Sequence, residues 1–585
     1  MTSPRPQAGP SWRGRAGRWW TAAALASATF LLFAPSAGHP FILYDDARYL
    51  TENPVVLRGL SWSGVRWAFT TLYFGNWHPL TWLSYLLDVQ LFGLDAGAHH
   101  LESAFIHAAN AALLFLVLDR MSGARGRSLA VALLFAVHPL RVESVAWAAE
   151  RKDVLSMLFG LLALLAYARY AERPSARRYA LVALAFALSL MAKAMWVTLP
   201  FLLLLIDLWP LSRLRPLGEP GDLSGARFPP VSLRRALLEK LPLLLLSIAT
   251  SAVTVVAQSD GGAMAGQELG LGARAANAVV ACAAYLGKIV WPSGLAVLYP
   301  LSPDGTPAWE VAGAAFLLLV VTAGALWQVR RRPWLMVGWC WFLGTLVPVI
   351  GLVQVGVQAM ADRYTYLPSI GVTLALVWGA AEALGAWRRG LPLRVAGAVA
   401  ALVLGILTWH QLGYWSDQVT VFEHAIAVTG PNSRAQGNLA NALRFEHRLD
   451  AAREHALEAV RLEPASSFLR LELALVQIDR GELPPAREEL ELAVRLNPRF
   501  ALAWSLLGEV HAAEGHLDAA RAALLEAARI APKEAQPWVK LGAVCAAFGR
   551  TEEALGAWRQ ALRVNPYEPE ALRQLGRAGS ALRSP

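Results

Sequence analysis

Long apolar stretches fill most of the first 420 residues, and they constrain the fold more than any other feature. A helix needs about 20 mostly apolar residues to cross the hydrocarbon core of a bilayer. The first such stretch is Trp20–Gly38, which follows Arg13, Arg15 and Arg18. Ten more lie near residues 100–119, 128–147, 154–171, 178–195, 197–212, 241–259, 311–329, 334–353, 364–385 and 395–414. The pattern predicts an all-α, polytopic membrane helix bundle of about eleven spans.

The stretch 274–303 is apolar as well, but Lys288, Pro292 and Pro300 interrupt it. We interpret it as an interfacial or re-entrant helix. Arginine clusters lie between the spans, near residues 120–127, 173–178, 213–235, 330–332 and 388–394. With the N-terminus inside, eleven spans place all five clusters on the cytoplasmic side, where basic loops are enriched. The loop 39–98 and the C-terminal tail are then expected on the outer side.

The distribution of charge supports this division. The chain has 53 Lys and Arg against 43 Asp and Glu, a formal net charge of +10, which alone admits nucleic acid or a membrane as partner. Residues 421–585 hold 20 basic and 21 acidic residues, so the whole excess belongs to the apolar part. We therefore expect a lipid bilayer, and no nucleic acid, as partner. Six of the basic residues are Lys, which favours a GC-rich bacterial genome and hence a multi-pass protein of the inner (plasma) membrane.

Proline recurs in the tail with a fixed period. Pro464, Pro498, Pro532 and Pro566 are each 34 residues apart. A 34-residue period with Pro closing each unit resembles the tetratricopeptide repeat, a helix–turn–helix unit that stacks into a solenoid. The predicted organisation is a cytoplasmic segment 1–19, a membrane domain 20–416, four repeats over 432–567, and a capping helix and tail over 568–585. We expect the solenoid to bind a peptide or protein, and a spacer or an oligomerisation surface is the alternative.

Two adjacent carboxylates follow the first span, in the string FILYDDARYLTENP. Asp45 and Asp46 suit a divalent cation, or one acts as general base while the other adjusts its pKa. A solvated turn is the alternative. Further polar and aromatic residues are expected on the same outer face: Trp77, His78, His138, Glu143, Glu150, Arg151, Lys152, Lys193, Arg363 and Tyr364. Ion pairing or snorkelling explains any one of them, whereas carboxylates beside several cations suit a reaction in which a phosphate leaves and a hydroxyl attacks.

Several strings occur in one order along the chain. The Asp pair is followed by HPLRVESVAWAAERKD at 138–153, AKAMWVTLP at 192–200, ADRYTYLP at 361–368 and then the repeats. This order resembles the transmembrane and tetratricopeptide-repeat-containing O-mannosyltransferases of the C-type glycosyltransferase superfamily. The resemblance implies a polyprenyl-phosphate-linked sugar, mannose or another hexose, as donor and Ser or Thr hydroxyls of proteins as acceptors. It also implies an active site on the non-cytoplasmic face, which is the periplasmic or extracytoplasmic side here, and repeats that bind the acceptor.

In such enzymes an acidic residue of the first outer loop is the catalytic base, which corresponds to Asp45 or Asp46 here, with Asp45 preferred. The donor phosphate is expected to bind Arg363, Lys152, Arg151 and Lys193. The sugar and acceptor pocket is expected to include His78, Trp77, His138, Glu143, Glu150 and Tyr364. This scheme requires no metal and no other cofactor, although the Asp pair can hold a divalent ion. Two other functions remain open: a non-enzymatic scaffold that recruits envelope proteins through its repeats, and a transporter or flippase for lipid-linked sugars.

Overall fold

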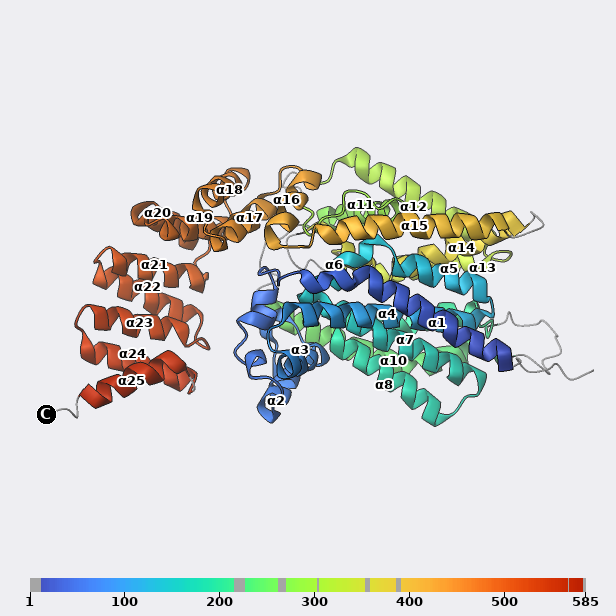
Figure 1. Ribbon diagram of the computed structural model, residues 1–585, viewed down its shortest axis with the longest axis horizontal. Coiled ribbons are helices and arrows are strands. Elements are labelled where there is room, and N and C mark those ends of the chain that lie inside the picture. The colour runs from blue at the N-terminus through green and yellow to red at the C-terminus, as the bar shows by residue number, and fades with distance from the viewer. Residues whose placement is uncertain are drawn as a thin grey trace, which may run out of the picture. The chain divides into compact units, whose positions relative to one another are not determined.

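The computed structural model describes residues 12–214, 227–260, 270–301, 305–352, 358–385, 391–566 and 568–581. Within these ranges every extended regular element is a helix, which confirms the predicted all-α class (Figure 1). The chain divides into two compact units, Met1–Val428 and Thr429–Pro585. Parts of the predicted cytoplasmic segment, of the last arginine cluster and of the C-terminal tail lie outside the described residues, namely 1–11, 386–390 and 582–585.

The first unit is a bundle of long and short helices. Its α-helices are α1 (Trp12–Phe33), α2 (Trp62–Thr70), α3 (Pro79–Phe92), α4 (Ala96–Ser122), α5 (Arg125–Ala136), α6 (Val142–Ala146), α7 (Arg151–Glu172), α8 (Ala176–Ala192), α9 (Leu199–Leu208), α10 (Leu233–Asp260), α11 (Leu271–Val290), α12 (Ala308–Gln328), α13 (Pro333–Leu346), α14 (Ser369–Gly385), α15 (Leu391–Gly413) and α16 (Gln418–Thr429). Short turns join them: η1 (Ala34–Gly38), η2 (Ala47–Thr51), η3 (Val56–Arg58), η4 (Tyr73–Gly75), η5 (Pro139–Arg141), η6 (Ala148–Glu150), η7 (Ala194–Thr198) and η8 (Asp362–Thr365).

Seven helices in the described residues are long and apolar enough to cross a membrane, so the chain is that of a multi-pass membrane protein. They are Ala16–Gly38, Ala96–Ser122, Ala148–Glu172, Leu233–Ser259, Leu271–Val290, Ala308–Gln328 and Arg394–Gly413. The helices Arg125–Ala136 and Pro139–Ala146 form a further candidate that bends by 61°. Other predicted spans correspond to shorter apolar helices, and the total of about eleven stays a prediction.

The apolar stretch 274–303 forms an unbroken helix for most of its length. Helix α11 has 20 residues, and by length and composition it is among those able to cross a membrane. The interrupting residues lie at its end, because Lys288 Nζ donates to the carbonyls of Ser293 and Gly294 (3.1 and 2.7 Å) and Pro292 follows the last turn. The expected break is therefore displaced to the loop after α11, and the interfacial placement of the helix stays a prediction.

Helix packing brings distant segments to one end of the first unit. Helix α4 packs against α1, α5 and α7, and α7 packs along α8 (Figure 1). Gly160 lets η7 approach α7, because a Cβ at this position would collide with the indole of Trp196. This contact fixes η7, and Lys193 immediately before it, beside the first turns of α7.

The second unit consists of paired antiparallel helices. They are α17 (Ser433–Phe445), α18 (Leu449–Leu462), α19 (Ser467–Asp479), α20 (Leu483–Leu496), α21 (Ala501–Ala513), α22 (Leu517–Ile530), α23 (Gln536–Ala547), α24 (Thr551–Val564) and α25 (Pro569–Ala581). Figure 1 shows α21 to α25 stacked one beside the next. Small residues make the close pairing within a repeat possible, since a Cβ at Gly508 would lie 2.6 Å from Leu524 Cγ. The predicted tetratricopeptide architecture is confirmed.

Candidate functional site

Asp46 anchors the loop after η1 to the turn that precedes α7. Its side chain is buried, one oxygen accepts the Ile42 amide at 2.8 Å, and the other accepts the Ala149 amide at 2.7 Å. Burial raises the pKa of Asp46 to about 7, although the two backbone hydrogen bonds lower it. Both carboxylate oxygens are therefore engaged in holding the backbone together.

Asp45 has a different environment, although it is the neighbouring residue. Its side chain is half-buried, and no described residue donates a hydrogen bond to its carboxylate. Its carbonyl begins the turn η2, a single π-helical turn, by accepting the Tyr49 amide at 3.0 Å. Burial raises the pKa of the Asp45 carboxyl, while the charges of Lys152 and Arg363 lower it. Asp45 is thus the carboxylate of the pair that is available to a ligand.

Three cations from three separate segments surround the buried carboxylate of Glu150. Lys152 Nζ lies 3.0 Å from one oxygen, Lys193 Nζ lies 3.1 Å from the other, and Arg363 Nε lies 3.4 Å from the first. Glu150 is 3% exposed. A buried carboxylate needs such compensation, because an isolated charge in an apolar interior is costly. We call Glu150 and its three cations the Glu150 cluster.

Two further carboxylates each bind one of these cations. Asp153 accepts from Lys193 Nζ at 2.6 Å and from the hydroxyl of Ser144 at 3.0 Å. Glu143 accepts the Arg363 backbone amide at 2.7 Å and pairs with its guanidinium. Each of these two cations therefore has two carboxylate partners, and its position is fixed before any substrate arrives.

Aromatic rings line the same region. Lys152 Nζ lies 4.6 Å from the centre of the Tyr49 ring, and Tyr49 stacks on His78. Burial, together with the charges of Lys152 and Lys193, lowers the pKa of His78, so this imidazole is neutral. Its buried position indicates a role in packing beside the cluster rather than in direct contact with solvent.

A second aromatic group flanks Arg363. Its guanidinium lies 5.6 Å from the Trp147 ring centre and 5.1 Å from that of Tyr364. Tyr44, next to Asp45 in the chain, stacks on Trp147 with centroids 5.8 Å apart and is 36% exposed. Because Trp147 is buried, Tyr44 is the exposed ring of this stack.

Three residues expected at the site have other partners in the structure, and their roles stay predictions. The Arg151 guanidinium is fully buried, pairs with Asp88 and Glu102, and is not part of the Glu150 cluster. Successive side chains of a helix point about 100° apart, so Arg151 and Lys152 face different neighbours. His138 is bound through its ring to the Ile289 carbonyl and the Leu140 amide, at 3.0 and 3.2 Å. Trp77 donates its indole N–H to the Phe69 carbonyl at 3.0 Å.

The structure also reveals contributors that the sequence analysis did not select. Tyr49 and Asp153 contact the predicted cations directly, and Ser144 donates to Asp153. Asp362, next to Arg363, accepts from the Tyr299 hydroxyl at 2.9 Å, and burial raises its pKa to about 6. No spacing in the sequence indicates these contacts, because the partners are brought together by helix packing.

Comparison with known proteins adds the family context. A family model described as the cilia and flagella-associated protein 70 C-terminal domain matches residues 407–582. Protein O-mannosyl-transferase TMTC1 of Mus musculus is 34% identical over 160 residues, which are 25% of this chain and 17% of that protein. Protein O-mannosyl-transferase tmtc2 of Xenopus laevis is 32% identical over 158 residues, 26% of this chain and 18% of that protein. The predicted resemblance to the O-mannosyltransferases is confirmed. The matches span less than a fifth of the length of these relatives.

Solved structures of tetratricopeptide-repeat proteins match part of the chain. YrrB, described as a protein with an unusual peptide-binding site, has 21% identity and a TM-score of 0.24, and the match covers 27% of this chain and 82% of YrrB. A thermophilic repeat protein of Thermus thermophilus has 23% identity and a TM-score of 0.26, with 32% and 96% of the two chains covered.

Proposed function

We propose that the chain is a membrane glycosyltransferase that moves a hexose from a polyprenyl-phosphate donor to Ser or Thr hydroxyls of proteins on the non-cytoplasmic face. The similarity to proteins named O-mannosyl-transferases supports the reaction class. The observation that carries the proposal is the half-buried Asp45 carboxylate, without a hydrogen-bond donor among the described residues, beside the three cations of the Glu150 cluster.

Asp45 is proposed as the general base. Its carboxylate takes the proton of the acceptor hydroxyl as the hydroxyl oxygen attacks the anomeric carbon. The bond between that carbon and the phosphate oxygen breaks, and the polyprenyl phosphate leaves with the electron pair. Because the hydroxyl attacks from the opposite face, the configuration inverts. The raised pKa of Asp45 strengthens it as a base relative to an ordinary aspartate.

Arg363, Lys152 and Lys193 are proposed to stabilise the charge that develops on the leaving phosphate. Their carboxylate partners place them in advance, so little reorganisation is needed during the reaction. A phosphate entering this region competes with Glu150, Asp153 and Glu143 for these cations. The scheme uses no metal, so we expect transfer to persist in the presence of EDTA.

The repeats are proposed to bind the acceptor protein, and the exposed ring of Tyr44 to stack on the sugar. The alternative is a non-enzymatic scaffold. It predicts that the isolated repeats carry the whole function of the protein.

The test compares Asp45→Asn with Asp46→Asn in the purified full-length protein. Asp45→Asn is expected to fold normally and to lower the rate of sugar transfer to a peptide by about 10²-fold or more, the range for loss of a general base. Asp46→Asn is expected to lower stability instead, because an amide cannot accept from both the Ile42 and Ala149 N–H groups. Unchanged transfer by the folded Asp45→Asn variant contradicts the assignment of Asp45 as the base, and absence of transfer by the parent chain favours the scaffold.

A further inference from the structure

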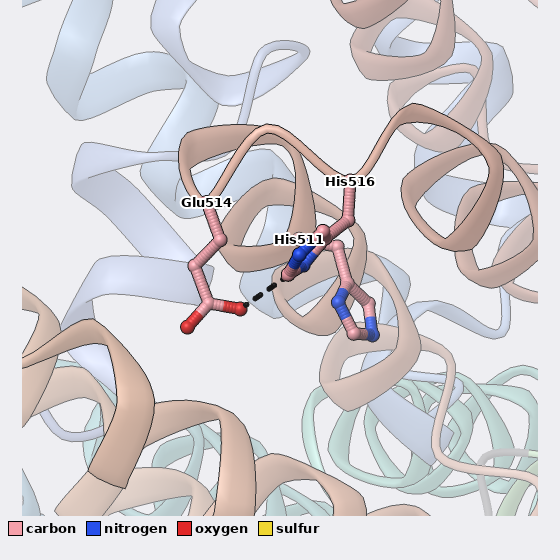
Figure 2. Close-up of side chains that lie close together, drawn as sticks. All are labelled: His511, Glu514 and His516. Atoms are coloured by element: carbon pink, nitrogen blue, oxygen red, sulfur yellow. Dashed lines mark ion pairs between the residues drawn. The ribbon is translucent and has the colours of Figure 1, made fainter.

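A group of metal-ligating side chains lies in the third repeat, apart from the candidate site. His511 belongs to the last turn of α21, and Glu514 and His516 follow in the turn before α22. One ligand atom of each residue lies within 4.8 Å of the other two. Figure 2 shows the three side chains close together, with His516 Nδ1 3.6 Å from a Glu514 oxygen. Gly515 has a φ of +86°, which lets the turn present both flanking side chains to the same space.

The 34-residue period shows how this turn differs from the others. At the positions of Glu514 and His516, the first repeat has Glu446 and Arg448, which form an ion pair of 3.2 Å. The second repeat has the reversed pair, Arg480 and Glu482, at 2.7 Å. The first two repeats thus have an ion pair across this turn, and the fourth has Phe548 and Arg550 at the same positions. In the third repeat an imidazole takes the place of the cation.

The helix position that corresponds to His511 changes in the same repeat. The other repeats have Leu443, Gln477 and Cys545 at this place. Two imidazoles and a carboxylate therefore meet in the third repeat alone among the four. The turn ion pair explains Glu514 with His516, but it does not explain the second imidazole.

The environment of His511 favours a ligand. Its Nδ1 atom is buried and has no hydrogen-bond partner among the described residues. An unsatisfied buried nitrogen is costly, and a bound cation removes that cost.

We propose that His511, Glu514 and His516 bind a divalent transition-metal ion of the Zn²⁺ class. Two imidazole nitrogens and one carboxylate oxygen are a ligand set that Zn²⁺ accepts, with a fourth position left for water or another ligand. His516 is 62% exposed, so an ion has direct access from solvent.

Arg487 sets the expected strength of the site. Its Nε lies 3.0 Å from the Glu514 oxygen, and its Nη1 bonds to Glu491 at 2.9 Å. A positive charge beside the ligands opposes a second cation, so the site is expected to be moderate in affinity. Arg487→Gln is expected to tighten Zn²⁺ binding.

The test uses the full-length protein in detergent, purified through a tag without histidine. After dialysis against Zn²⁺, the metal content is measured by mass spectrometry, and Co²⁺ is titrated with detection of its visible absorption. His511→Gln and His516→Arg introduce residues that other repeats of this chain carry, so both variants are expected to fold. Each should lose about one bound ion per chain, the content of a single three-ligand site, and weaken Co²⁺ binding roughly tenfold or more.

His447→Asn is the matched control, because it removes a histidine from the equivalent turn of the first repeat at a position with a φ of +58° that Asn tolerates. It should leave the metal content unchanged. The proposal is overturned if His511→Gln and His516→Arg bind as much metal as the parent chain while their helix content is unchanged. A loosening of Co²⁺ binding by Arg487→Gln contradicts it as well.

Discussion

Glu150 of the membrane unit and Glu458 of the repeat unit illustrate two different kinds of ion pair. In the membrane unit, Glu150 is buried and holds cations that lie as far away in the sequence as Arg363. In the repeat unit, ion pairs such as Glu458 with Arg461 join residues three apart on an exposed helix face. The first arrangement exists only when the bundle is packed, while the second forms within one helix. The comparison teaches that charges able to act on a substrate are those that the fold, rather than the local chain, has brought together.

Glu150→Ala provides the largest expected effect. Three cations lose a shared partner in a buried site, and breaking a buried ion pair costs about 3–5 kcal/mol. The free energy of unfolding, measured by denaturant titration of the detergent-solubilised protein, should fall by that amount. If the free energy of unfolding falls no further than in a variant of an exposed ion pair, the distinction between buried and exposed pairs is wrong.

The pH dependence of transfer gives an intermediate effect. The base must be ionised, so activity is present above the raised pKa of Asp45 and is lost as the pH falls through it, by about tenfold per pH unit. Arg48 lowers that pKa, so Arg48→Gln should move the acidic limit of the rate profile to higher pH. Arg58→Gln, which removes another exposed arginine of the same loop, should leave the profile in place. Equal shifts in the two variants contradict the assignment of the limit to Asp45.

Glu458→Ala provides the smallest expected effect. The Glu458–Arg461 pair is exposed, and exposed pairs contribute little because water screens them. The midpoint of thermal unfolding should agree with that of the parent chain within error. A clear decrease would show that exposed ion pairs of the repeats also contribute to stability, which would contradict the difference drawn between buried and exposed pairs.

The fold was largely predictable from local patterns. The 34-residue spacing of Pro464 to Pro566 indicates the repeats, and the helix pairs follow that spacing. The length of the apolar stretches indicates the membrane helices, although α11 shows that this criterion can misjudge an interrupted stretch. In the sequence, Lys288 interrupts the apolar stretch. In the structure the helix continues through Lys288, whose side chain extends beyond the helix end and donates to backbone carbonyls.

The site was predictable in part. The residues Asp45, Glu150, Lys152, Lys193 and Arg363 were selected from the sequence, and the structure places them together. The sequence left the choice between Asp45 and Asp46 open, with Asp45 preferred, and it did not indicate their different environments, since adjacent residues of one type have the same local pattern. Two backbone amides make the difference, and one of them belongs to a segment about a hundred residues away.

The sequence by itself determined that this protein has an apolar helical bundle and a repeat solenoid. Both follow from periodicity and composition, which act over a few helical turns. Tertiary structure alone decided that Asp88 binds Arg151 and that Arg363 joins Glu150. The reason is physical, because Coulomb and coordination interactions depend on distance in space, and helix packing sets that distance for residues far apart in the chain.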